Sequence, residues 1–120
     1  MSGLWLCDAN ADIRALYDEL APGNVCLPPD EVLARLDRGE VPTGVVIDDL
    51  SLARLPNDAR LHLLGRTRVV VCTASASEAA ALLPSAGVVQ ARIMEKPFSL
   101  DQFAAAVEWL TAASGQPRAG

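Results

Sequence analysis

The alternation of short apolar runs with segments of helical period is the feature that most constrains the fold of this chain. Each of five runs of strand length is followed by a segment whose apolar residues recur every three or four positions, the spacing of one helix face. Because parallel neighbouring strands need crossover connections, this order predicts a five-stranded parallel sheet with helices on both faces, a three-layer α/β/α architecture. The expected strands are Leu4–Cys7, Val25–Leu27, Gly44–Ile47, Arg68–Cys72 and a fifth within residues 88–94.

Capping and turn residues place helices between these runs. Asn10 is a candidate N-cap for a first helix, which Pro22 and Gly23 end. Prolines and acids at residues 28–31 suit the start of a second helix, and Gly39 ends it. A weaker helix is expected over 52–64; its regular part opens at 56–58 and Gly65 closes it. A short helix is expected over 78–83. The last helix follows a capping box of Ser99 and Gln102.

Length and composition fit a single self-sufficient domain. We expect residues 1–113 of the 120 to form it and residues 114–120 to be a flexible C-terminal tail or the start of a linker. With 51% hydrophobic residues the chain is too apolar for bulk disorder. No apolar stretch reaches the ~18 residues of a membrane span and the start lacks the basic residues of a signal peptide, so we expect a cytoplasmic protein that does not bind membranes. A net charge of −5 without a cluster of arginines disfavours nucleic-acid binding.

Cysteine and lysine usage adds two expectations. The three cysteines form no C-x-x-C pair and lie within apolar runs, which is typical of buried thiols in a reducing compartment. Of the ten basic residues, only Lys96 is a lysine, which suggests that this position needs an amine rather than a guanidinium.

Polar side chains gather where the expected strands end. In open α/β sheets, ligands bind beyond the carboxyl ends of the strands. Asp8 follows the first strand, Asp48 and Asp49 the third, Thr73 the fourth and Lys96 the fifth. Such a set of carboxylates, a hydroxyl and an amine can hold a divalent cation and a phosphoryl group. An aspartate can also accept phosphate covalently, because that chemistry depends mostly on positioning and electrostatics.

Four segments at these strand ends, in order and with compatible spacing, carry a resemblance to a known family. Across about residues 3–113 the chain resembles the receiver domains of bacterial two-component response regulators, which implies a flavodoxin-like (βα)5 topology. The matching segments are Leu4–Asp8 with Arg14 six residues after the acid, Val45–Asp48, Val69–Ala74 and Lys96–Phe98.

The resemblance implies a role for each matching site residue. Asp48 is similar to the phosphoacceptor, Thr73 to the hydroxyl residue that contacts the phosphoryl group, and Lys96 to the lysine that binds it. Asp8, Asp48 and Leu50 are the implied ligands of Mg²⁺, with Asp8 similar to the first member of the acidic pair. The Lys96–Pro97 bond is expected to be cis, as is usual in the family.

Several positions depart from the family pattern. Ala9 replaces the second acid, which puts metal binding in doubt; Asn10 or Asp49 could partly substitute, or Asp8 could take the second role if the strand end is read one residue out of step. Arg14 favours the first reading. Ile93 stands where receivers usually carry a Tyr or Phe that reports phosphorylation, and Ser51-Leu52 replaces the usual Met-Pro.

The favoured function is a phosphoacceptor receiver domain, not an enzyme, which takes a phosphoryl group on Asp48 from a sensor histidine kinase or a phosphotransfer protein. Phosphorylation is then expected to alter how the surface binds a partner or a second copy. The resemblance implies pairing of two copies through the fourth helix, fifth strand and fifth helix. The alternative is a degenerate receiver that serves as a phosphorylation-independent interaction module, as Ala9 and Ile93 suggest. A phosphocarrier using Cys7 is a weaker alternative, since no basic residues flank the thiol. His62 is expected on a helix surface, and Trp109 in the core or facing a partner.

Overall fold

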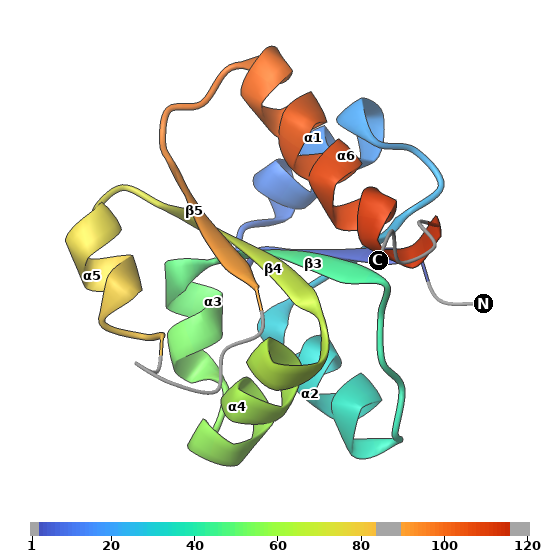
Figure 1. The fold of residues 1–120 in the computed structure, drawn as a ribbon, viewed down its shortest axis with the longest axis vertical. Helices are drawn as coiled ribbons and strands as arrows, with labels where there is room; N and C mark the ends of the chain where they lie inside the picture. The colour runs from blue at the N-terminus through green and yellow to red at the C-terminus, as the bar shows by residue number, and fades with distance from the viewer. Residues whose placement is uncertain (1–2, 84–89, 116–120) are drawn as a thin grey trace, which may run out of the picture.

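Five parallel strands form one sheet in the order β2-β1-β3-β4-β5 (Figure 1). The computed structural model describes residues 3–83 and 90–115. Every adjacent pair of strands is parallel, so the five-stranded parallel sheet predicted from the alternation is confirmed. The strands are β1 (Leu4–Cys7), β2 (Val25–Leu27), β3 (Gly44–Asp48), β4 (Arg68–Thr73) and β5 (Ala91–Glu95).

Helices cover both faces of the sheet. Two of them, α1 and α6, lie on one face, and the other four lie on the opposite face (Figure 1). The predicted three-layer architecture is therefore confirmed. The helices are α1 (Ala11–Leu20), α2 (Pro29–Asp37), α3 (Asp49–Arg54), α4 (Asn57–Arg66), α5 (Ala76–Ala80) and α6 (Leu100–Gly115).

The period of two along each strand divides the apolar residues between two cores. In β1, Leu4 and Leu6 pack with α1 and α6, whereas Trp5 and Cys7 pack toward α2, α3 and α4. The central strand β3 is buried on both faces along its whole length. A sheet covered on both sides leaves its strand ends as the open edges where polar groups can reach solvent.

The segment between β3 and β4 differs from the expectation of one helix over 52–64. It contains two helices, and α3 already begins at Asp49 because the Asp48 side chain caps it by accepting a hydrogen bond from Ser51 N at 3.2 Å. Pro56, which has no N–H, precedes α4. The expectation that Gly65 closes this helix was wrong: α4 runs on to Arg66.

Other boundaries shift by smaller amounts. The helix expected over 78–83 is α5, which begins at Ala76 because Ser75 Oγ accepts from Glu78 N at 3.4 Å. The fifth strand reaches Glu95, one residue beyond the expected range, and residues 84–89 lie outside the described part. The last helix continues through Gly115, so the tail expected from residue 114 starts inside it; residues 116–120 lie outside the described residues.

The predicted caps are confirmed. Asn10 Oδ1 accepts from Asp12 N at 2.8 Å at the start of α1. Ser99 and Gln102 form the reciprocal capping box before α6, with bonds of 3.1 and 2.8 Å. After α2, Gly39 takes a positive φ of 84°, the conformation that favours glycine. None of the helices in 3–83 and 90–115 combines the length and apolarity that crossing a bilayer requires.

Candidate functional site

Two buried carboxylates lie side by side where the strand order changes direction. Cys7 of β1 pairs with Ile47 of β3, so the register places Asp8 next to Asp48 at the carboxyl ends of the two strands. Each of the two aspartates is 4% exposed. Aspartate is rarely buried without a partner, so this pair is the strongest functional signal at the sheet edge.

One oxygen of each carboxylate is held by the backbone and the other is not. Asp8 Oδ1 accepts from Asn10 N at 2.8 Å, and Asp48 Oδ2 accepts from Ser51 N at 3.2 Å. The remaining oxygens, Asp8 Oδ2 and Asp48 Oδ1, are buried and have no hydrogen-bond partner among the described residues. Because buried polar atoms are almost always paired, these two oxygens are poised for a proton, a water molecule or a cation.

The charges around Asp8 show which groups face it. Burial raises the pKa of Asp8 above its ordinary value of 3.8, and the negative charge of Asp48 raises it further. The hydrogen bond from the Asn10 backbone, and the positive charges of Lys96 and Arg14, lower the pKa of Asp8. Lys96 and Asp48 therefore both lie within electrostatic reach of the Asp8 carboxylate, although they come from different strand ends.

The loop after β5 brings Lys96 to this edge. Lys96 N donates to the carbonyl oxygen of Thr73 at 2.7 Å, which ties the end of β5 to the end of β4. The Lys96–Pro97 bond is cis, as the resemblance implied. At the other side of the site, Arg14 Nη1 donates to the carbonyl oxygen of Asp8 at 2.7 Å, so the arginine six residues after the acid also belongs to this edge.

The hydroxyl of Thr73 is held by Asp49, a contact that the sequence reasoning missed. Thr73 is fully buried, and its Oγ1 donates to Asp49 Oδ2 at 2.7 Å and accepts from Ser75 N at 2.9 Å. Asp49 was considered as a substitute metal ligand and not as a partner of Thr73. The strand register could have indicated the contact, since Asp48 pairs with Cys72 and the next positions are Asp49 and Thr73.

The donor set around the two carboxylates suits a small hard cation. Ala9 offers no donor group, and the Asn10 amide oxygen is occupied by capping α1. The side chain of Leu50 is 69% exposed and apolar, so Leu50 could ligate only through its carbonyl oxygen. The described residues contain no group of three or more His, Cys, Asp or Glu side chains suited to a metal ion. Magnesium is commonly bound by one or two carboxylates and several waters, so Asp8 and Asp48 fit Mg²⁺.

The thiols have different surroundings from those of a reactive cysteine. Cys7 is fully buried, and desolvation together with the charge of Asp48 raises its pKa to about 12. Cys72 is also buried, with its pKa raised by desolvation to about 11, whereas Cys26 is half-buried. A protonated, inaccessible Cys7 argues against the phosphocarrier alternative.

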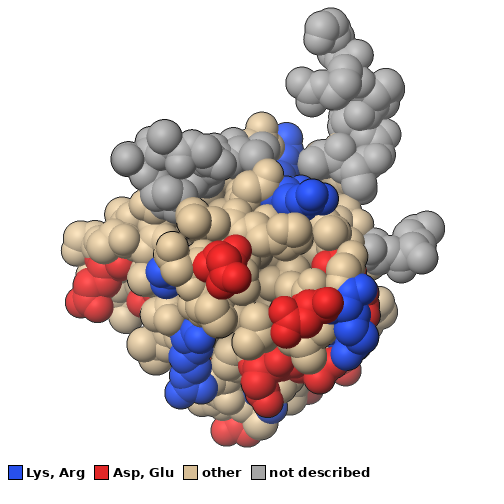
Figure 2. Space-filling view, turned by 90° about the horizontal axis from the view of Figure 1, so that it is seen from below, with Lys and Arg blue, Asp and Glu red and all other residues tan. Residues whose placement is uncertain are grey.

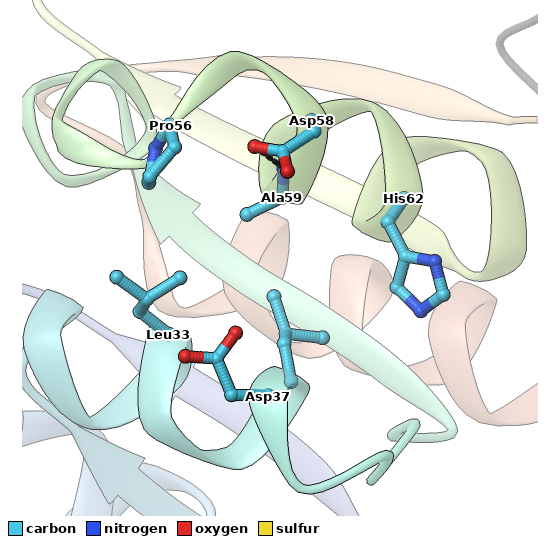
Figure 3. A pocket seen from close by; sticks show the side chains of 7 residues that line it. Leu33, Asp37, Pro56, Asp58, Ala59 and His62 are labelled. Carbon is cyan, nitrogen blue, oxygen red and sulfur yellow. Dashed lines mark hydrogen bonds between the residues drawn. The ribbon is translucent and has the colours of Figure 1, made fainter.

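A groove between α2 and α4 lies apart from these residues (Figure 3). It encloses about 470 Å³ between Leu33 and Leu36 on one helix and Ala59 on the other. Asp37 and Asp58 come from the facing helices at its rim, and the exposed His62 also lines it, which confirms the surface position predicted for this histidine (Figure 3). None of the strand-end residues described above lines the groove, so it forms no part of the carboxylate site.

Charged residues of both signs are interspersed on the face seen from below in Figure 1 (Figure 2). At α2 and in the residues just after it, Arg35 and Arg38 form ion pairs with Glu31 and Glu40. This face therefore presents no continuous basic surface of the kind that follows a nucleic-acid backbone.

Comparison with solved structures decides the fold family. A response regulator receiver protein from Sinorhizobium medicae is similar over 93% of this chain and 95% of its own, with a TM-score of 0.69 and 22% identity. The chain has the receiver fold. The receiver domain of Francisella response regulator 1452 is similar over 95% and 99% of the two chains, with a TM-score of 0.64 and 17% identity. The beryllofluoride-activated NtrC receiver domain is similar over 97% and 98%, with a TM-score of 0.58 and 23% identity.

No protein-family model and no curated protein sequence matches this chain. The similarity to receiver domains is therefore a similarity of fold, and it confirms the flavodoxin-like receiver topology that the four segments implied. Within this receiver fold, Asp8, Asp48, Thr73 and Lys96 all stand at the carboxyl ends of strands.

Proposed function

We propose that this chain is a phosphoacceptor receiver domain of a two-component signalling system, in which Asp48 takes a phosphoryl group from the phosphohistidine of a sensor kinase or a phosphotransfer protein. The observation that supports the proposal most is the pair of buried oxygens, Asp8 Oδ2 and Asp48 Oδ1, which have no hydrogen-bond partner among the residues that the structure describes. They lie where the strand order of this receiver fold changes direction, between β1 and β3. Lys96, the only lysine of the chain, is within electrostatic reach of the Asp8 carboxylate.

The two oxygens of Asp48 would play different parts. Oδ1 attacks phosphorus, so that a P–O bond forms while the P–N bond to the imidazole breaks. The electron pair of the broken bond stays on the imidazole nitrogen, which is protonated from solvent if the ring was neutral. Oδ2 becomes the carbonyl oxygen of the acyl phosphate and keeps the hydrogen bond from Ser51 N. Lys96 supplies a compact positive charge for the phosphoryl oxygens.

Asp8, Asp48 and the carbonyl oxygen of Leu50 are the groups that would hold Mg²⁺. When bound, Mg²⁺ offsets the negative charge of the carboxylates and of the phosphoryl oxygens. The residues of the chain itself orient this arrangement: Asn10 N fixes the Asp8 carboxylate, and Arg14 fixes the backbone that carries it. In this proposal the domain is a stoichiometric acceptor and not an enzyme.

Phosphorylation would change the surface presented to a partner. A phosphoryl group adds about −1.5 to −2 charge and strong acceptor oxygens, which bias the hydrogen bonds made by Thr73 and Lys96. The surface that responds in the proposal comprises α5, β5 and α6, the fourth helix, fifth strand and fifth helix of the expected five pairs, and a second copy is one candidate partner. On this surface Trp109 lies under the guanidinium groups of Arg68 and Arg92, at 4.8 and 4.2 Å.

The direct test is incubation with acetyl phosphate and Mg²⁺, followed by intact mass spectrometry. The proposal predicts the added mass of a single phosphoryl group on the wild type and none on Asp48→Asn or in excess EDTA. Labelling that survives Asp48→Asn would place the acceptor elsewhere and contradict the proposal.

A degenerate receiver that binds partners without phosphorylation is the second candidate. Ala9 at the position of the second acid and the engagement of Thr73 by Asp49 favour it. A folded wild-type protein that takes up no phosphoryl group and shows no response to Mg²⁺ would select this candidate over the first.

A further inference from the structure

We propose that Asp49 is a positioning residue that holds the hydroxyl of Thr73 in the resting state and thereby opposes phosphorylation of Asp48. This inference rests on the proposed function, because it concerns how readily Asp48 accepts a phosphoryl group. It gives a role to the second acid of the Asp48-Asp49 pair, which a phosphoacceptor site does not itself require.

Asp49 is fixed between two elements. Its Oδ1 accepts from Leu50 N at 2.9 Å within the first turn of α3, and its Oδ2 accepts from Thr73 Oγ1 at 2.7 Å at the end of β4. The strand register explains the reach, since Asp48 is the last residue of β3, it pairs with Cys72, and Asp49 and Thr73 are the next residues after that pair. Both carboxylate oxygens are used, so the side chain of Asp49 bridges α3 and β4 directly beside the proposed acceptor.

The Thr73 hydroxyl has a single proton to donate. Two acceptors are in range, Asp49 Oδ2 at 2.7 Å and Ser75 O at 2.9 Å, while Ser75 N donates to the same hydroxyl at 2.9 Å. The carboxylate is both nearer and charged, so it is the stronger acceptor. No hydrogen bond joins Thr73 to Asp48 within the described part of the chain. In the resting state the Thr73 proton is therefore committed to Asp49 and not offered toward Asp48.

A phosphoryl group on Asp48 would have to compete with this arrangement. Its oxygens must take the Thr73 proton from Asp49, and their charge repels the neighbouring carboxylate. A hydrogen bond to a charged group is strong enough to change an equilibrium about tenfold when it is lost. Ser75 contacts the Thr73 hydroxyl and also caps α5. Release of the hydroxyl from Asp49 would therefore change the hydrogen bonds at the start of that helix.

The test compares the phosphorylated fraction at steady state, with acetyl phosphate and Mg²⁺, across a set of variants. Asp49→Ala is expected to raise the ratio of phosphorylated to unphosphorylated protein about tenfold. Asp49→Asn, which keeps an acceptor oxygen without the charge, is expected between wild type and Asp49→Ala. In a Thr73→Ala background the gain from Asp49→Ala is expected to shrink, because the hydroxyl through which Asp49 acts is gone.

Asp58→Ala is the matched control. Asp58 also lies in the first turn of a helix, and its Oδ1 accepts from Ala59 N at 3.0 Å, as Asp49 Oδ1 accepts from Leu50 N. It makes no contact with Thr73 among the described residues, so its removal should leave the phosphorylated fraction unchanged. Circular dichroism confirms that each variant is folded, and Asp49→Asn carries the test if Asp49→Ala is not.

The outcomes separate the two proposals. A phosphorylated fraction in Asp49→Ala no higher than in wild type, or an equal gain with and without the Thr73 hydroxyl, overturns the role of Asp49 and leaves the acceptor role of Asp48 standing. Absence of a phosphoryl adduct in the wild type and in every variant overturns both.

Discussion

Asp8 and Asp48 are two like charges removed from water, held close because the strands that carry them are neighbours. Each keeps one oxygen with no hydrogen-bond partner in the described residues. Burial of ionisable groups in this way costs stability, and proteins tolerate it mainly where the groups have a function. The stability of the metal-free domain should therefore depend on the charge of Asp8.

Asp8→Asn is predicted to stabilise the metal-free domain at neutral pH by about 1 kcal/mol, within the range that single stabilising substitutions commonly give. The pKa of Asp8 is raised in the folded state, so the folded form binds this proton more tightly than the unfolded form. The loss of stability caused by the Asp8 charge is therefore absent below pH 3.8. It grows as the pH rises through the raised pKa of the folded state, and it stays constant at higher pH. Urea unfolding in EDTA at several pH values measures it.

This measurement tests the sign of the stability difference between Asp8→Asn and wild type. A variant whose advantage over wild type disappears in acid and is full at neutral pH agrees with the account. An Asp8→Asn protein less stable than wild type at neutral pH would mean that the charge of Asp8 is compensated in the folded state, which contradicts the raised pKa of Asp8.

The sequence could predict which residues meet at the site, but not all of the contacts between them. The places of Asp8, Asp48, Thr73 and Lys96 were predictable because each stands at the carboxyl end of a strand, and the carboxyl ends of parallel strands lie at one edge of the sheet. The contact between Asp49 and Thr73 can be anticipated only once the register of β3 and β4 is known, and a sequence pattern gives neither that register nor the side-chain rotamer. Nor does a sequence pattern show that Ser51 N holds Asp48 Oδ2, since that bond follows from where α3 begins.

At the scale of elements, strands were predicted more accurately than helices. Apolar runs such as Val69–Val71 have no competing interpretation, so the first four observed strands differ by at most one residue from the expected ones. The segment between β3 and β4 was misjudged because Asp48 serves at once as a site residue and as the N-cap of α3. A glycine inside a helical pattern was taken as a stop, whereas Gly65 lies within α4.

Close packing of β3 against α6 gives a prediction at this scale. A Cβ on Gly44 would lie 3.0 Å from the Cβ and Cδ2 atoms of Leu110 and 3.1 Å from Cδ2 of Leu4. Gly44→Ala is therefore expected to lower the free energy of unfolding by about 1–3 kcal/mol, through overpacking. Gly3→Ala is the control, because its nearest neighbour, Asn24 Oδ1, is at an ordinary 3.5 Å, and its effect should stay within about 0.5 kcal/mol. Equal stability of the two variants in urea would contradict this packing.

At the scale of the whole molecule, the alternation of strand and helix predicted the topology almost without help from individual residues. Five strands joined by helices leave few arrangements once crossovers must be right-handed. The order β2-β1-β3-β4-β5 puts its change of direction between β1 and β3, the strands that carry the two carboxylates. The fold therefore brings together residues from both ends of the chain at one site.

Magnesium should stabilise the molecule as a whole if it binds between these carboxylates. A ligand that binds only the folded state raises the thermal midpoint in a saturable way. We predict such a rise for the wild type, with a parallel change in the fluorescence of the buried Trp5, three residues before Asp8. Asp8→Ala should abolish both responses. A rise that persists in that variant would indicate weak surface binding of the cation instead.

Locating the phosphoryl group along the chain tests the proposed acceptor role of Asp48 most directly. After labelling with acetyl phosphate and Mg²⁺, borohydride reduces an aspartyl phosphate to homoserine, and peptide mass spectrometry locates the altered residue. Homoserine is expected at position 48 alone. Reduction at position 49, or at neither aspartate in a folded protein, would overturn the acceptor role of Asp48.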